Sequence, residues 1–196
     1  MKRGKLIVFE GISGTGKETQ AKLLQEYLVS RGINSQIVYH PSTDLKDILS
    51  IWRSERNIHA LTEIYLLLAD RSSCVNQTII PALERGEWVI SLRSWISALV
   101  YQGETQEFRR MIREEFGRFE PKPDYLFYFD IDPTIAYDRA RDRHNRTGEP
   151  MGKFETPENL TDMRSRYLTV MKSMPHSTVN ALAVIDEIHR KIIKFF

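Results

Sequence analysis

The residues between Gly11 and Lys17 carry the clearest chemical signal in the sequence. The run Gly11-Ile12-Ser13-Gly14-Thr15-Gly16-Lys17 has the glycine spacing of a phosphate-binding P-loop. Glycines let the backbone curl so that successive amide hydrogens point at phosphate oxygens, an approach that bulky residues would block. Lys17 adds a positive charge at the start of a helix whose dipole favours the same anion. The pattern predicts a nucleoside triphosphate site.

Glu18 stands where a P-loop normally carries the serine or threonine whose hydroxyl binds Mg²⁺, and a hydroxyl follows only at Thr19. One interpretation is that Glu18 is simply an acidic residue favoured in a first helical turn. The other is that its carboxylate binds Mg²⁺, directly or through water. The sequence predicts that Mg²⁺ accompanies the triphosphate, and both interpretations of Glu18 stay open.

The elements that must position this loop alternate between strands and helices. Four apolar, β-prone runs predict buried parallel strands at Leu6 to Phe9, Gln36 to Tyr39, Trp88 to Leu92 and Tyr125 to Phe129. Helical spacing extends from Lys17 to near Gly32 and recurs at Leu45 to Arg53, Leu61 to Leu83, Thr105 to Phe116, Pro133 to Arg143, Pro157 to Met171 and Val184 to Phe195. Such alternation is typical of an α/β fold with parallel crossovers, and Leu6 to Phe9 belongs at its centre.

Length and composition narrow the class further. The chain has 196 residues, a net charge of +2 and one cysteine, Cys74. This length fits one domain, residues 1–196, and the small charge does not favour a stable nucleic-acid or membrane partner. The run at Leu6 is too short for a signal-peptide core, and no stretch has the length of a membrane span. We expect a cytoplasmic protein.

The segment His144 to Lys153 is the clearest candidate for a mobile loop. Thr147, Gly148, Pro150 and Gly152 interrupt a charged stretch between two helical patterns. Arginines precede and enter the segment.

Several short motifs, in order along nearly the whole chain, resemble the thymidylate kinase family. They are Phe9-Glu10-Gly11, Gly14-Thr15-Gly16-Lys17, Thr19-Gln20, Leu68-Ala69-Asp70-Arg71, Pro81-Ala82-Leu83, Arg93, Ser97, Tyr101-Gln102-Gly103, Asp130-Ile131-Asp132-Pro133 and Arg139-Ala140-Arg141. The resemblance implies a P-loop kinase fold, with a central parallel sheet of about five strands flanked by helices and an arginine-rich lid near residues 144–153. It also implies transfer of a phosphoryl group from ATP, with Mg²⁺, to a pyrimidine nucleoside monophosphate, dTMP in the family.

The resemblance assigns roles by position. Residues 11–19 would bind ATP, and Arg71 and Arg93 would hold the acceptor's phosphate, which suits their planar guanidinium groups. Arg93 follows a buried strand at its carboxyl end, where open α/β sheets place ligands. The remaining acceptor-binding residues would be Leu67, Ser97, Tyr101 and Gln102, the last three near one helix face.

A second group of arginines corresponds to the family's lid. Arg139, Arg143 and Arg146 share a helical face, and Arg141 lies between them. The resemblance makes Lys17, Arg93, Arg139 and Arg141 the catalytic residues, which would neutralise charge on the transferring phosphoryl group. A solvated basic helix face explains the same arginines equally well.

The departures from the family pattern fall in the inferred site. Ser13 replaces an aspartate, Leu92 replaces the acidic partner of Arg93, and His40-Pro41-Ser42 replaces Glu-Pro-Gly. Leu67 replaces a phenylalanine that stacks on thymine, so it offers apolar contact without a π-face. Three acidic groups are thus missing, while Glu18 adds one.

These departures leave three hypotheses. The first is a kinase for a pyrimidine nucleoside monophosphate, the second a nucleotide-binding protein that has lost catalysis, and the third a kinase for a different nucleotide or nucleoside. The family usually forms homodimers through helices. The apolar pattern from Leu61 to Leu83 could supply such a face, although burial within one chain explains it as well.

Overall fold

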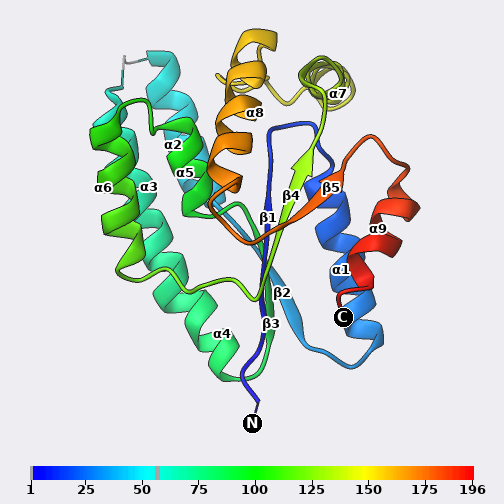
Figure 1. Ribbon diagram of the computed structural model, residues 1–196. Coiled ribbons are helices and arrows are strands. Elements are labelled where there is room, and N and C mark those ends of the chain that lie inside the picture. The colour runs from blue at the N-terminus through cyan, green and yellow to red at the C-terminus, as the bar shows by residue number, and fades with distance from the viewer. Residues whose placement is uncertain (1, 56–57) are drawn as a thin grey trace.

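The computed structural model describes residues 2–55 and 58–196 and contains one five-stranded parallel sheet (Figure 1). In the sheet the strands run in the order β2-β3-β1-β4-β5. Their bounds are β1 Leu6–Glu10, β2 Ser35–Tyr39, β3 Trp88–Leu92, β4 Tyr125–Asp130 and β5 Ser177–Asn180. The α/β architecture and the four predicted strands are confirmed.

The sequence of β1 suits its central position in the sheet. All five of its side chains are buried, and it pairs in parallel with β3 on one side and β4 on the other. An uninterrupted apolar run suits a strand that helices cover on both faces. In the register, Phe9 lies beside Leu92 and Phe127, so three strands end close together and deliver the loops that follow them to one edge of the sheet.

Helices cover both faces of the sheet (Figure 1). On one face α1 (Lys17–Ser30) packs against α9 (Ile185–Ile193), and on the other lie α3 (Ala60–Cys74), α4 (Ile80–Glu84), α5 (Trp95–Tyr101) and α6 (Gln106–Gly117). Helix α2 (Thr43–Glu55) packs on α3, and α8 (Pro157–Met171) packs on α5 and α7 (Pro133–Thr147). Among the described residues, no helix is both long and apolar enough to span a membrane.

The predicted helix from Leu61 to Leu83 is continuous but contains one wide turn. Between α3 and α4 the segment η1 (Val75–Ile79) is a π-helix, in which the N–H of Ile80 bonds to the carbonyl of Val75. Pro81 lacks an N–H and its ring crowds the preceding turn, which explains the wide turn just before it. On α3, Ile64 and Leu67 enter the core whereas Tyr65 is 55% exposed. The homodimer stays a prediction.

Two boundaries differ from the sequence prediction. Helix α7 continues through Thr147, so His144 to Thr147 are helical and the loop predicted at residues 144–153 begins at Gly148. Gly148 has φ of 72°, a left-handed conformation that ends the helix and suits glycine. Strand β5 was not among the predicted runs, because Ser177, Thr178 and Asn180 are polar residues on an edge strand.

Candidate active site

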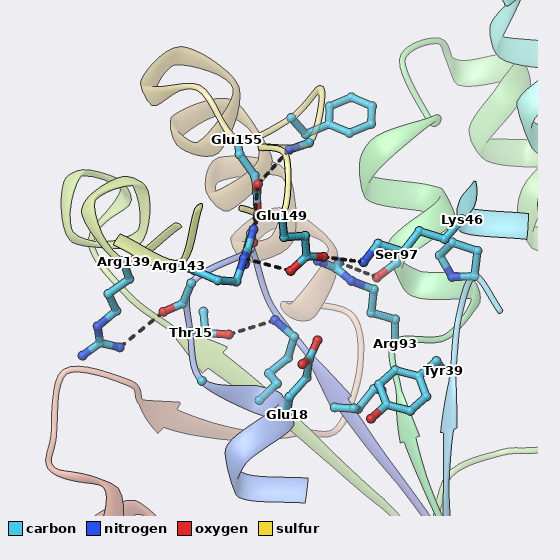
Figure 2. Close-up of a pocket in the computed structure, with 18 of the residues that line it drawn as sticks. Thr15, Glu18, Tyr39, Lys46, Arg93, Ser97, Arg139, Arg143, Glu149 and Glu155 are labelled. Carbon is cyan, nitrogen blue, oxygen red and sulfur yellow. Dashed lines mark hydrogen bonds and ion pairs between the residues drawn. The ribbon is translucent and has the colours of Figure 1, made fainter. Parts of the chain in front are cut away.

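A cavity of about 1170 Å³ lies at the carboxyl ends of the strands. The P-loop, the ends of β2 and β3, helices α2, α5 and α7, and the loop between α7 and α8 all contribute to its lining. Figure 2 shows Thr15, Glu18, Arg93 and Arg143 converging on this space from different elements. Parallel α/β sheets place ligands at this edge, so the cavity is the candidate active site.

The conformation of the P-loop explains its glycines. Gly11, Gly14 and Gly16 have φ of 142°, 77° and 79°, values that other residues adopt only with strain. A Cβ on Gly14 would also lie 2.4 Å from the carbonyl oxygen of Ala136, the first-turn region of α7. The loop therefore packs against α7 through its bare backbone, which leaves its other side open to the cavity.

Lys17 is held inside this loop. Its Nζ donates to the carbonyl oxygens of Gly11 at 2.9 Å and Ile12 at 2.7 Å, and to Thr15 Oγ1 at 2.8 Å. Burial lowers the pKa of Lys17 well below its ordinary value, and the positive charge of Arg93 lowers it further. A polyphosphate anion would relieve both effects, so the loop favours such a ligand.

The structure brings most of the predicted ATP-binding residues to the cavity. Residues 13–19 line it, including Glu18, whose side chain is exposed, whereas Gly11 and Ile12 contribute carbonyl oxygens to Lys17 from behind the loop. Ser13 donates its hydroxyl hydrogen to Glu155. A carboxylate from the loop after α7 thus stands beside the residue where the family's aspartate is missing.

Arg93 enters the cavity from the end of β3 with an unusual backbone. Its φ is 72°, a left-handed value that is uncommon outside glycine, and its N–H bonds to the carbonyl of Phe9. Its guanidinium carbon lies 5.0 Å from the ring centroid of Tyr101, and its Nη1 donates to Ser97 Oγ and Tyr167 Oη. Burial alone would lower the pKa of Arg93, but Tyr101, Tyr167 and Glu10 raise it above its ordinary value. Arg93 therefore stays cationic.

Arg71, the other predicted phosphate-binding arginine, does not reach the cavity. Its side chain is fully buried, and its Nε and Nη2 donate to the two carboxylate oxygens of Glu120 at 2.9 and 2.6 Å. Its Nη1 donates to Ser91 Oγ, which in turn donates to the carbonyl oxygen of Arg93. In this structure Arg71 supports the backbone at the end of β3 and has no free edge toward the cavity.

The predicted acceptor residues lie together at one end of the cavity. Leu67, Ser97, Tyr101 and Gln102 all line it, and the Gln102 amide Nε2 donates to Glu63 at 3.1 Å. Arg53 binds the same Glu63 carboxylate through two hydrogen bonds of 3.0 Å each. Sequence reasoning missed Arg53 and Glu63, because nothing in their local spacing pairs a residue on α2 with one on α3.

Of the arginines predicted for the lid, some line the cavity and one does not. Arg139, Arg143 and Arg146 line the cavity, whereas Arg141 is outside it, paired with Asp138 on the surface of α7. Arg139 donates to the carbonyl oxygens of Gly14 and Ala181. Three arginines of one helical face therefore point at the site, and the placement of Arg141 does not support a catalytic role.

Carboxylates from the loop after α7 bridge the lid to the rest of the cavity. Arg143 donates to Glu155 at 2.7 and 2.9 Å and pairs with Glu149 at 3.5 Å. Glu149 also pairs with Lys46 on α2 at 3.0 Å, and Figure 2 shows these side chains in a row across the cavity. Glu149 and Glu155 gave no sequence signal, since each is an ordinary charged residue in a polar loop.

The three positions that lack the family's acidic groups, Ser13, Leu92 and His40, all line this cavity. His40 is buried, and its Nδ1 lies 3.2 Å from Asp70 Oδ2. Burial lowers the pKa of His40, an effect that the hydrogen bond to Asp70 only partly offsets. The imidazole is therefore neutral near pH 7 and does not bring positive charge to the site.

Two buried groups behind Arg93 were also missed. Glu10 ends β1, and Tyr167 lies on α8, far away in sequence, with both side chains fully buried. A carboxylate at the end of a buried strand was the available signal for Glu10. For Tyr167 there was none, because its position on the inner face of α8 predicts core packing.

Comparison with known proteins matches the chain over nearly its full length. The family model described as thymidylate kinase matches residues 9–192. Thymidylate kinase from Fervidobacterium nodosum is 33% identical over 195 residues, covering 97% of each chain. Thymidylate kinase from Nitrosospira multiformis is 32% identical over 207 residues, covering 98% of this chain and 96% of the relative. A probable thymidylate kinase from Archaeoglobus fulgidus is 32% identical over 196 residues, covering 97% and 95%.

Proposed function

Because this chain belongs to the thymidylate kinase family, we propose that it transfers the γ-phosphoryl group of ATP to dTMP, giving ADP and dTDP. The observation that carries the proposal is that one cavity holds both the P-loop with Lys17 and the guanidinium of Arg93. A triphosphate on the loop and a monophosphate on Arg93 would share this space. Their phosphates could therefore meet without water between them.

Phosphoryl transfer of this kind requires positioning and charge stabilisation more than covalent chemistry. Lys17 would release its three loop oxygens and bind the outer phosphates of ATP, with the P-loop amides around it. Arg93 would hold the acceptor's phosphate from the opposite side of the cavity. The γ-phosphoryl group would then pass between two fixed cations, which favours the spread of negative charge in the transition state.

The lid would add charge during the reaction. Arg139 and Arg143 line the same cavity, and both are bound to oxygen atoms that a phosphate could replace. We expect Arg143 to exchange part of its contact with Glu155 for a phosphate oxygen when both substrates are bound. Such an exchange would complete the site only in the loaded enzyme.

Mg²⁺ would accompany ATP, and the carboxylate of Glu18 would help to hold it. Mg²⁺ in such sites keeps several waters and is bound through one or two carboxylates together with substrate phosphates. Glu18 is exposed, lines the cavity and follows Lys17 directly. We expect Glu18→Gln to raise the Mg²⁺ concentration needed for half-maximal turnover, and an unchanged Mg²⁺ dependence would remove Glu18 from the metal site.

The proposal is tested by measuring diphosphate formation from ATP with dTMP, dUMP, UMP, dCMP, CMP, GMP and AMP. We expect dTMP to give the highest kcat/KM, and Lys17→Ala to reduce turnover on the order of a thousandfold because it removes the charge on the outer phosphates. Arg141→Ala is the matched control, because this arginine lies outside the cavity. Absence of turnover with every acceptor would exclude the proposed activity, and preference for another monophosphate would exclude dTMP as the substrate.

A further inference from the structure

A buried carboxylate lies behind Arg93 without touching it. Glu10 is fully buried at the end of β1, and its Oε1 accepts hydrogen bonds of 2.8 Å from both the N–H and the hydroxyl of Ser94. Its Oε2 accepts from the hydroxyls of Ser97 and Tyr167, again at 2.8 Å. These four donors leave neither oxygen of the buried carboxylate without a hydrogen-bond partner.

The hydroxyls of Ser97 and Tyr167 connect this carboxylate to Arg93. Nη1 of Arg93 lies 3.1 Å from Ser97 Oγ and 3.2 Å from Tyr167 Oη. A guanidinium has no acceptor, so both hydroxyls must accept from Arg93 and direct their own hydrogens elsewhere. Both hydroxyl hydrogens are directed to Glu10 Oε2, and the two hydroxyl oxygens lie 2.8 Å from each other. Burial, with the nearby charge of Glu10, raises the pKa of Tyr167 well above its ordinary value, so its hydroxyl keeps its proton.

The contrast with Arg71 shows what this relay achieves. Arg71 meets the Glu120 carboxylate directly, through two hydrogen bonds, and no part of it reaches the cavity. Arg93 is bound to neutral hydroxyl oxygens at one nitrogen, and within residues 2–55 and 58–196 it forms no ion pair. Glu10 can therefore orient Arg93 without neutralising it at close range, so the positive charge stays available to a phosphate.

We propose that Glu10 and Tyr167 are positioning residues for the acceptor's phosphate: together with Ser97 they form a carboxylate–hydroxyl relay that fixes Arg93 and leaves its charge toward the cavity. This inference rests on the proposed function, since it assumes that Arg93 binds the phosphate of dTMP. It also reassigns Ser97. The Ser97 hydroxyl serves Arg93 and Glu10 and does not contact the acceptor's base or sugar.

Tyr167→Phe isolates the relay from the surrounding packing. The phenyl ring preserves the stacking on Tyr128, at 5.5 Å between centroids, and the edge contact with Tyr101 at 6.3 Å. Only the hydroxyl is lost, so Nη1 keeps one acceptor where it had two. The matched control is Tyr128→Phe, which removes a neighbouring buried hydroxyl that donates to Asp130 and not to the relay.

The test compares the binding of dTMP with that of thymidine, which lacks the phosphate, by calorimetric titration of the full chain. Wild type should bind dTMP more tightly than thymidine. Tyr167→Phe should weaken dTMP binding on the order of tenfold and leave thymidine binding unchanged, because a loosely held Arg93 affects only the phosphate. Ser97→Ala is a second, independent variant and should show the same selectivity, while Tyr128→Phe should bind both ligands as wild type does.

A cycle with Arg93→Met completes the test. If the relay acts through Arg93, Tyr167→Phe should have no further effect on dTMP binding once Arg93 is replaced. Equal weakening of both ligands would identify a general structural role and overturn the inference. So would undiminished dTMP binding in both Tyr167→Phe and Ser97→Ala, or a Tyr167→Phe effect that persists without Arg93. A wild type that binds dTMP and thymidine equally would instead refute the proposed function, and the inference with it.

Discussion

At the scale of single residues, the partner of a charged side chain decides what that side chain can do. Arg71 and Arg93 are both arginines near the end of β3, and sequence reasoning gives them the same role. Their partners in the structure differ. Arg71 pairs with the Glu120 carboxylate, whereas Arg93 donates to two hydroxyl oxygens. Since an arginine is cationic in either setting, its neighbours determine whether its charge is available to a ligand.

The placement of Arg71 leads to a stability prediction. Arg71→Met should lower the free energy of unfolding by about 3–5 kcal/mol, because it leaves the buried Glu120 carboxylate without its partner. The double variant Arg71→Met/Glu120→Leu should recover most of this loss, since no buried charge remains. Urea unfolding of the two variants and wild type measures both effects.

The same double variant distinguishes two roles for Arg71, supporting the end of β3 and binding the acceptor's phosphate. If Arg71 only supports the end of β3, the refolded double variant should bind dTMP within about twofold of wild type. If Arg71 held the acceptor's phosphate, dTMP affinity would fall sharply although stability had been restored. A double variant that is stable but has lost dTMP binding would return Arg71 to the acceptor site.

At the scale of elements, the pattern of apolar residues predicted the strands and helices that are buried in the core. Leu6 to Phe9 lies in the central strand, and its four consecutive buried residues suit a strand that helices cover on both faces. Strand β5 was not predicted because most of its residues are polar and only Val179 is buried. It therefore lacks the continuous apolar run by which the other strands were recognised. The predicted lid began too early because His144 to Thr147 are as compatible with a helix as with a loop, and Gly148 ends α7.

The part of the candidate site that could be predicted is the P-loop, which binds through its backbone. The P-loop requires glycines at fixed spacing, so sequence alone located Lys17 and residues 13–19 correctly in the cavity lining. Glu10, Tyr167 and Glu155 become functional candidates through contacts that span more than a hundred residues, as between Ser13 and Glu155. Contacts of this kind depend on how α8 and the loop before it pack, and no local pattern encodes that packing.

At the scale of the whole molecule, many charges lie at one edge of the sheet, and acid should weaken their arrangement. Hydrogen bonds lower the pKa values of three carboxyl groups, although burial alone would raise them. Asp70 is bonded to His40, Asp130 to Arg164, and Glu155 to Arg143. A carboxyl group whose pKa is lower in the folded than in the unfolded state stabilises the fold above its unfolded pKa. That stability is lost as the pH falls toward the folded value.

His40 should respond first, at a milder pH than these carboxyl groups. Burial lowers the pKa of His40 below the ordinary value of 6.5. Below pH 6.5, His40 therefore takes up a proton more readily in the unfolded chain than in the folded chain. The free energy of unfolding should therefore fall from about pH 6.5 downward, by at most about 1.4 kcal/mol per pH unit for this one proton. Urea unfolding at about pH 7.5, 6.5 and 5.5 should show a smaller fall in His40→Gln than in wild type. His189 is the control, because its pKa is also lowered by burial but it lies on α9 beside Tyr27. A pH dependence that His189→Gln flattens and His40→Gln leaves intact would place the acid-sensitive group on α9, away from the cavity.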